Sequence, residues 1–204
     1  MLKDDRAVLF VHVPKAGGTT LERLFTDSGW TMRYRTTWRS NPEVFRLLRV
    51  SPQHYHGALL EELFKLDRFE HIFQVCRDPI HRFRSEFAMR NKTLTEADAS
   101  TVEAWADEQF GLYATNPYLL DNHLRPQVDF LVPGVEVYRL EDGMKEIVDD
   151  LNGRYDMGLS TQIRHRLRSE NHGLPSSAVE ISDSLQAHLH EFYAADFERF
   201  GYPR

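Results

Sequence analysis

The chain has 204 residues, of which 41% are hydrophobic and 27% charged, values that are ordinary for a globular protein with a single domain over residues 1–204. Its 25 Lys and Arg residues against 31 Asp and Glu residues give a net charge of −6, which argues against nucleic acid as a partner. The single cysteine excludes an internal disulfide and a thiolate zinc cluster, and the lack of a signal peptide or a membrane-spanning apolar run favours a cytoplasmic protein.

The first apolar stretch is expected to form a buried strand that leads into a short loop and a helix. Residues 7–13 are apolar apart from His12, a composition typical of a strand with both faces buried. Leu21, Leu24 and Phe25 then recur at helical spacing. The loop between the strand and the helix has the sequence Pro14-Lys15-Ala16-Gly17-Gly18-Thr19-Thr20.

This loop has the properties of a phosphate-binding site. Backbone N–H groups and the helix dipole attract anions at the start of a helix. Gly17 and Gly18 let the backbone approach a ligand closely, Thr19 and Thr20 offer hydroxyls, and Lys15 adds a positive charge. An ordinary strand-to-helix turn with a glycine pair is the alternative interpretation. The Walker A order Gly-Lys-Ser/Thr is missing, which weakens the case for an ATPase or GTPase.

Two histidines follow a polar segment. Residues 33–52 are interrupted by two prolines and are expected to form a loop with a short helix near residues 43–48, a reasonable place for substrate contacts. His54 and His56 precede a predicted helix at residues 58–64, so that one imidazole could lie over a site. A single histidine is more often a surface or core residue, and no nearby cysteine or carboxylate completes a metal-ligand set. We therefore expect no metal.

A second buried strand, at residues 71–76, runs directly into another anion-binding pattern. Pro79 is favourable just inside a helix start, so we expect a helix from this residue. Arg77 then stands at the carboxyl end of a strand, where open α/β sheets bind ligands. Ser85 lies two turns along the helix and could share one phosphate with Arg77. The alternative is an arginine paired with an acidic residue on the helix surface.

The rest of the chain is less informative about function. A packing helix is predicted over residues 95–113, a strand over 135–140, a helix over 143–151, and a final core helix marked by Ile181, Leu185, Leu189, Phe192 and Phe200.

The two anion-binding segments, in this order, resemble those of sulfotransferases that use 3′-phosphoadenosine 5′-phosphosulfate. Residues 14–21 are similar to the 5′-phosphosulfate loop of that family. Arg77-Asp78-Pro79, with Arg82 and Ser85, is similar to its 3′-phosphate segment. The likeness is closest to the carbohydrate branch, which contains heparan 2-O and chondroitin enzymes and many short bacterial members. It continues at residues 122–131, 135–142 and 192–202 and so covers most of the chain.

The resemblance implies a P-loop-like three-layer α/β fold, with a central parallel sheet flanked by helices. It also implies transfer of a sulfuryl group from 3′-phosphoadenosine 5′-phosphosulfate to an acceptor hydroxyl of a carbohydrate. Lys15 would neutralise charge on the bridging oxygen of the donor, and the loop residues Ala16, Gly17, Gly18, Thr19 and Thr20 would hold the 5′-phosphate. Arg77 and Ser85 would hold the 3′-phosphate.

A histidine base is also implied. In heparan 2-O enzymes a histidine pair with i, i+2 spacing supplies the base, and His54 and His56 match that spacing. We prefer His56, although an alignment on Leu59-Leu60 favours His54, and Tyr55 replaces the glycine between the family's histidines. The expected contacts with the acceptor are made by Arg33, Trp38, Arg125 and Gln127.

Two other functions are compatible with the sequence. A P-loop kinase or nucleotide hydrolase would fit the strand, loop and helix, but it would require magnesium-dependent ATP binding without a preference for a 3′-phosphate. A binding module that keeps the nucleotide site and has lost transfer would have the same two motifs.

Overall fold

A computed structural model describes residues 1–36, 41–162 and 173–204. The chain folds into two compact units. Residues 1–76 and 129–164 form the first, named here the sheet unit, and residues 77–128 and 165–204 form the second, the helical unit. The prediction of a single domain over residues 1–204 stays a prediction, and the two units are described separately.

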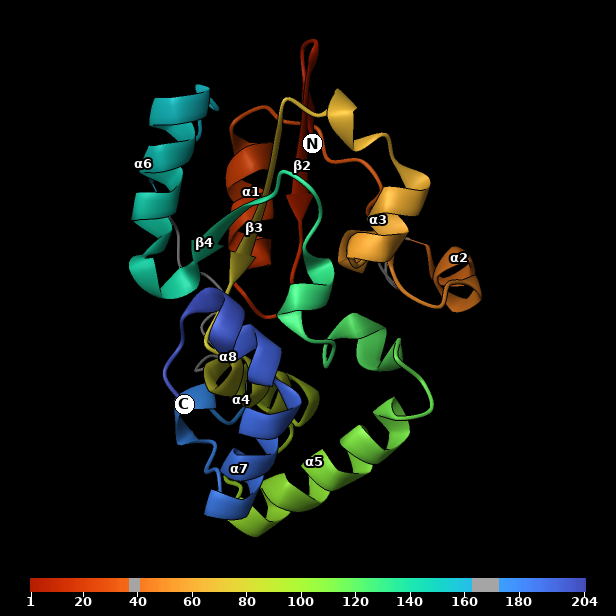
Figure 1. Cartoon of the computed structure of the whole chain (residues 1–204), viewed down its shortest axis with the longest axis vertical. Coiled ribbons are helices and arrows are strands. Elements are labelled where there is room, and N and C mark those ends of the chain that lie inside the picture. The colour runs from red at the N-terminus through yellow and green to blue at the C-terminus, as the bar shows by residue number, and fades with distance from the viewer. Residues whose placement is uncertain (37–40, 163–172) are drawn as a thin grey trace. The chain divides into compact units, whose positions relative to one another are not determined.

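The sheet unit is built on four strands in the order β1-β2-β3-β4 (Figure 1). Their bounds are Leu2–Lys3 for β1, Arg6–Val11 for β2, His71–Cys76 for β3 and Glu136–Arg139 for β4. β1 pairs antiparallel with β2, whereas β2, β3 and β4 are parallel, with Val11 opposite Gln74 and Gln74 opposite Val137. The carboxyl ends of the three parallel strands therefore meet at one edge of the sheet, as the predicted fold class requires.

Helices cover both faces of this sheet. The helices of the sheet unit are α1 (Gly18–Asp27), α2 (Pro42–Leu47), α3 (Gly57–Leu63) and α6 (Met144–Tyr155), and α1, α3 and α6 pack on the sheet. On one face, α1 and α6 pack a core around Phe25, Phe73 and Leu151. On the other face, Leu60 of α3 packs with Val11 and Ile72, and Figure 1 shows α3 across the strands from α1 and α6. The mixed α/β fold with a mostly parallel sheet flanked by helices is confirmed.

The amino end of the chain differs from the prediction. The sequence analysis placed the first strand at residues 7–13, but Leu2 and Lys3 already form β1 and pair with Ala7 and Arg6. Asp4 has a φ of 50° in the intervening turn. The predicted strand also ends early, at Val11, because the following residues already form the loop.

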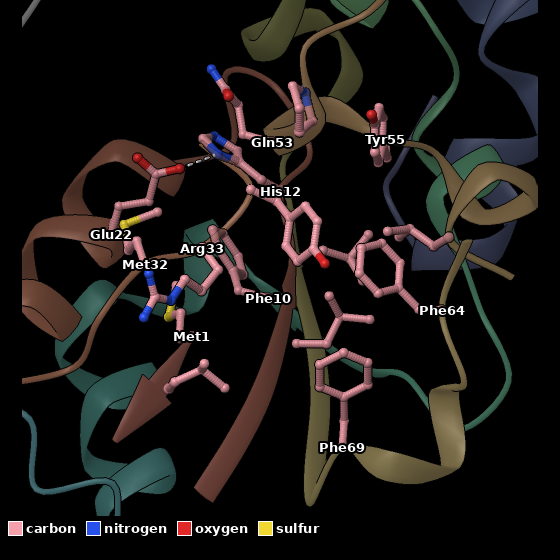
Figure 2. Close-up of a pocket in the computed structure, with 16 residues that line it drawn as sticks. Met1, Phe10, His12, Glu22, Met32, Arg33, Gln53, Tyr55, Phe64 and Phe69 are labelled. Carbon is pink, nitrogen blue, oxygen red and sulfur yellow. Dashed lines mark hydrogen bonds and ion pairs between the residues drawn. The ribbon is translucent and has the colours of Figure 1, made fainter. Parts of the chain in front are cut away.

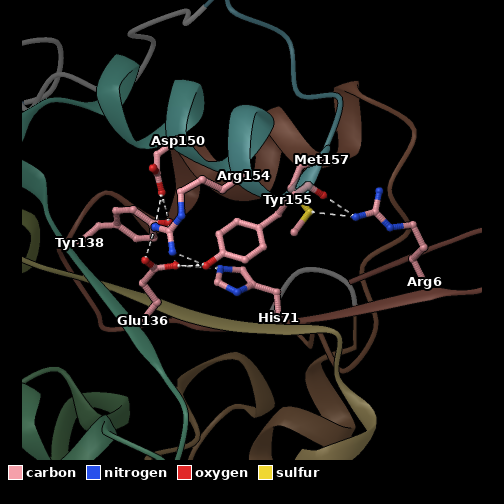
Figure 3. Close-up of polar contacts among 8 residues, drawn as sticks. All are labelled: Arg6, His71, Glu136, Tyr138, Asp150, Arg154, Tyr155 and Met157. Carbon is pink, nitrogen blue, oxygen red and sulfur yellow. Dashed lines mark hydrogen bonds and ion pairs between the residues drawn. The ribbon is translucent and has the colours of Figure 1, made fainter.

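A polar network fixes α6 to the amino ends of the strands (Figure 3). Glu136, the first residue of β4, accepts a hydrogen bond of 2.6 Å from the Tyr155 hydroxyl and pairs with Arg154. The ring of His71, the first residue of β3, stacks on Tyr155 with centroids 3.7 Å apart. Arg6, the first residue of β2, donates to the carbonyl of Tyr155. All three parallel strands are thus tied to α6 at the edge opposite the loops.

The helical unit contains α4 (Pro79–Arg90), α5 (Ala99–Tyr113), α7 (Asp183–Phe192) and α8 (Ala194–Phe200). The prediction of one final helix is wrong, because the chain leaves helical geometry at Tyr193, with φ −99° and ψ 22°. Tyr193 is buried, and its hydroxyl donates to the Leu124 carbonyl over 2.9 Å. Apolar positions continue on both sides of the break, and no proline or glycine marks it in the sequence. Within the described ranges, no helix is both long and apolar enough to cross a membrane.

Charged side chains of α4 bind the segment at residues 123–125. Arg82, which is 2% exposed, donates to the carbonyls of His123 and Arg125, both over 2.7 Å. Glu86 contacts His123 Nδ1 at 2.6 Å and Arg90 Nε at 2.7 Å. Burial by itself would raise the pKa of Glu86, but His123 and Arg90 more than offset this effect and lower the pKa to about 2.

We expect this carboxylate to make the stability of the protein depend on acid pH. The pKa of Glu86 in the folded protein lies below its value in the unfolded chain. The ionised carboxylate therefore adds to the free energy of unfolding above about pH 4.5, and this contribution is lost as the pH falls toward 2. The shift corresponds to a free energy of unfolding on the order of 3 kcal/mol. Urea unfolding at pH 7 and pH 3 should show Glu86→Gln to be less stable at pH 7 and less sensitive to acid. The exposed Glu198 on α8 supplies the control variant Glu198→Gln, and an equal acid response in all three proteins would contradict the assignment.

Candidate functional site

The loop between β2 and α1 presents an uncapped helix start. Gly17 occupies the N-cap position of α1 in the left-handed conformation, with a φ of 85°, and has no side chain to cap the helix. Lys15 has a φ of 68°, which is uncommon for a residue other than glycine. The first turn, residues 18–21, contains no acidic residue. The backbone donors and the dipole of a ten-residue helix therefore suit an anion at this position.

Gly18, the second glycine of the loop, is required by a different contact. A Cβ atom at this residue would lie 2.1 Å from Nε2 of His12. The imidazole thus packs directly against the backbone at the first residue of α1. This contact fixes the chain on both sides of the loop at residues 13–17, which is predicted to bind phosphate.

The sequence analysis missed the pair formed by His12 and Glu22. His12 Nδ1 and Glu22 Oε1 are 2.8 Å apart, and both residues are buried. Burial alone would raise the pKa of Glu22, but His12, followed by Arg35 and His54, lowers it overall. Glu22 is therefore ionised at neutral pH and accepts the Nδ1 proton of His12. The signal in the sequence was the single histidine in an apolar strand, directly before a glycine loop.

One of the two predicted histidines lies against this pair. The ring of His54 meets the ring of His12 edge-on, with centroids 4.9 Å apart, and its Nδ1 is 3.3 Å from Ser51 Oγ. His56 is the N-cap residue of α3. The next residue, Gly57, approaches the chain so closely that a Cβ atom would lie 2.3 Å from the carbonyl oxygen of Leu131.

A cavity of about 300 Å³ lies beside the His12–Glu22 pair, entirely within the sheet unit. Figure 2 shows His12, Glu22 and Gln53 at one end of it and Phe64 and Phe69 at the other. Arg33, which the sequence analysis predicted as an acceptor contact, also lines the cavity. Trp38, predicted for the same role, lies outside the described residues.

In the helical unit, hydrogen bonds to its backbone N–H and carbonyl hold Arg77 in place. It directly follows Cys76, the last residue of β3. The side-chain amide of Gln127 accepts from the Arg77 N–H over 2.9 Å and donates to the Arg77 carbonyl over 2.7 Å. Asp196 of α8 accepts in turn from the backbone N–H of Gln127, over 2.9 Å. Burial raises the pKa of this carboxyl more than its surrounding donors lower it.

The remaining predicted site residues, Gln127, Arg125 and Ser85, differ in their burial and contacts. Gln127 is fully buried and acts on the Arg77 backbone, and Arg125 is buried with bonds to Asn122 and to the carbonyl of Pro117. The structure thus gives both residues positioning contacts within the helical unit. Ser85 is half-buried on α4, and the prediction that it binds phosphate stays a prediction.

The comparison with known families agrees with this geometry. A family model described as "Sulfotransferase family" matches residues 1–203. The chain belongs to the sulfotransferase family. No curated protein and no solved structure matches it. The match identifies a transferase of sulfuryl groups and spans both units of this sulfotransferase.

The contact between Gly18 and His12 predicts a non-additive pair of substitutions. Gly18→Ala should lower the free energy of unfolding by about 1–3 kcal/mol, because the new methyl group overlaps the imidazole. In a His12→Ala background the same substitution should cost less than about 0.5 kcal/mol, since the space is then open. Denaturant unfolding of the four proteins measures this difference.

Gly111 in α5 provides the control, because a Cβ atom there would have no neighbour within 4 Å. Gly111→Ala should be neutral or stabilising by up to about 1 kcal/mol. Equal costs of Gly18→Ala in both backgrounds would show that the imidazole does not pack against this glycine.

Proposed function

We propose that this sulfotransferase moves a sulfuryl group from 3′-phosphoadenosine 5′-phosphosulfate to an acceptor hydroxyl and releases adenosine 3′,5′-bisphosphate. The observation that carries the proposal is the uncapped start of α1 behind Gly17, within a chain that matches the family over its whole length. In this proposal the 5′-phosphate lies against the backbone of residues 16–20, with the hydroxyls of Thr19 and Thr20 beside it.

The 3′-phosphate is assigned to Arg77 and Ser85. The assignment rests on the sequence motif, and it is supported by the position of Arg77 directly after β3, a neighbour of β2 in the parallel sheet. The hydrogen bonds from Gln127 limit the backbone freedom of Arg77. An arginine held in this way loses less conformational entropy when its guanidinium binds a phosphate.

The proposed step is an in-line displacement at sulfur. The acceptor oxygen forms a new S–O bond as the S–O bond to the 5′-phosphate breaks, and a neutral imidazole takes the hydroxyl proton. Lys15 neutralises the charge that develops on the departing oxygen. We assign the base to His54 or His56, and the contact between His54 and the His12 ring supports His54. Positioning and charge stabilisation supply most of the catalysis, as in phosphoryl transfer.

The acceptor contributes only a hydroxyl to this step. The resemblance to the carbohydrate branch favours a sugar. Among the predicted acceptor contacts that the structure describes, Arg33 lines the cavity beside His12. The composition of that cavity favours a different class of acceptor, which the next subsection considers.

Arg77 should discriminate between two nucleotides. Arg77→Ala should weaken binding of adenosine 3′,5′-bisphosphate by about 10–100-fold, because a charge-assisted hydrogen bond contributes about 1.5–3 kcal/mol. Binding of adenosine 5′-monophosphate should change less than about twofold. Calorimetry measures both affinities, and Arg199→Ala, at an exposed residue of α8, is the control. If Arg77→Ala lowers the affinity for both nucleotides equally, Arg77 does not bind the 3′-phosphate.

Lys15 and the base should affect turnover rather than affinity. Lys15→Ala and His54→Gln should each lower the release of bisphosphate from the donor by about 10²–10⁴-fold, measured with a mixed panel of sugars and phenols. Affinity for the bisphosphate should stay within about threefold in His54→Gln. Lys65→Ala, at an exposed lysine, is the control. If His56→Gln loses turnover and His54→Gln keeps it, the base is His56, and full turnover in both variants excludes the pair.

A further inference from the structure

We infer that the cavity of the sheet unit is the acceptor site and that it takes a neutral, largely apolar alcohol with one hydroxyl, such as a two-ring phenol. The inference rests on the proposed function, because it names the acceptor class for the same transfer. It departs from the carbohydrate acceptor that the sequence resemblance implies.

One wall of the cavity is formed by the end of β2. β1 and Met1 pair with Arg6, Ala7 and Val8, and the following residues of β2, Leu9, Phe10 and Val11, line the cavity. The next residue, His12, also lines the cavity, and its ring packs against Gly18 at the start of α1. One imidazole therefore separates the cavity from the phosphate loop. A molecule in the cavity would therefore approach the transferred sulfuryl group at the end lined by His12.

The lining is mostly apolar away from that end. Among the described residues that line the cavity, His12, Glu22, Arg33 and Gln53 have charged or amide side chains, and Tyr34 and Tyr55 each carry one hydroxyl. The other lining residues are aliphatic or aromatic, and the ring of Tyr34 packs against Phe64 with centroids 5.0 Å apart. The labelled side chains in Figure 2 show the two rings of Phe64 and Phe69 away from the Glu22–His12 contact. The cavity thus has one end with charged and amide groups and one mainly aromatic end.

This distribution selects against sugars. A monosaccharide carries hydroxyls around its whole ring, and each hydroxyl buried against an apolar wall without a partner costs about 1–3 kcal/mol. An alcohol with one hydroxyl places it at the polar end and buries the rest of its surface favourably. The polar end is marked by His12 and Glu22, whose Nδ1 and Oε1 atoms lie 2.8 Å apart.

The volume sets the size of the ligand. The cavity of about 300 Å³ has roughly twice the volume of an engineered apolar cavity of about 150 Å³ that binds benzene. A bicyclic phenol therefore fits without displacing core side chains. In the transfer, its oxygen bonds to sulfur as the S–O bond to the 5′-phosphate breaks, its proton passes to the proposed base, His54 or His56, and the bisphosphate leaves. The ring of His54 meets that of His12 at the polar end of the cavity.

The test uses 2-naphthol and methyl β-glucoside as probes of the whole protein without nucleotide, with naphthol fluorescence and calorimetry as readouts. Met32 is half-buried and lines the cavity, so Met32→Trp should fill it and weaken naphthol binding at least tenfold. Leu63→Trp is the matched control, because Leu63 is 55% exposed on α3 and outside the lining. It should change the affinity less than twofold. The glucoside should show no measurable binding.

Binding of the glucoside in preference to naphthol overturns the inference, and so does equal naphthol affinity in wild type and Met32→Trp. A second arm follows formation of naphthyl sulfate from the sulfated nucleotide, which should occur in wild type and fall at least tenfold in Met32→Trp. If the protein sulfates a sugar and not naphthol, the acceptor class is wrong and the proposed transfer stands. If calorimetry finds no affinity for adenosine 3′,5′-bisphosphate, the proposed function itself fails.

Discussion

The geometry of the site depends on the contact between the imidazole of His12 and the backbone of Gly18. A methyl group at Gly18 would overlap this ring, so the ring and the helix start occupy adjoining space without a gap. Glu22, one turn further along α1, holds the ring by its Nδ1 atom. The end of β2 and the first turn of α1 are thereby joined across the loop that they enclose. The loop residues can adopt uncommon backbone conformations, such as the positive φ of Lys15, because both of its ends are fixed.

The sheet separates the interactions that stabilise the unit from those assigned to function. Arg6, His71 and Glu136 begin the three parallel strands and take part in the polar network around α6. The phosphate loop and Arg77 follow the carboxyl ends of two of the same strands. A parallel arrangement makes this separation possible, because all three amino ends lie at one edge. Ion pairs at that edge stabilise the sheet without placing carboxylates beside the anion-binding loop.

Much of the fold could be predicted from the sequence, because its signals are local. The apolar run of β3 and the proline at the start of α4 specify these elements without help from distant residues. β1 was missed because two residues carry no periodic pattern, and they form a strand only by pairing with β2. The break at Tyr193 was missed because its cause, a hydrogen bond to the carbonyl of Leu124, is distant in the sequence.

The same distinction applies to the site. The loop residues and Arg77 could be selected from motifs, since each lies beside the strand that positions it. The roles of His12, Glu22 and Gln127 could not, because each depends on a partner that only the fold brings near. The acceptor contact predicted for Gln127 stays a prediction, and the structure shows that its amide also holds the backbone of Arg77.

Donor and acceptor recognition in this protein can therefore change independently. In the proposed site the donor contacts come from loop backbone and charged side chains. The cavity is lined by other parts of the sheet unit, which include the start of the chain, β2, residues 32–34, residues 52–55 and Leu60 of α3. A substitution such as one at Phe64 alters the cavity without touching the phosphate loop. His12 is the exception, because it contacts both regions. In the proposed acceptor site, this position of His12 places the acceptor hydroxyl at one end of the cavity.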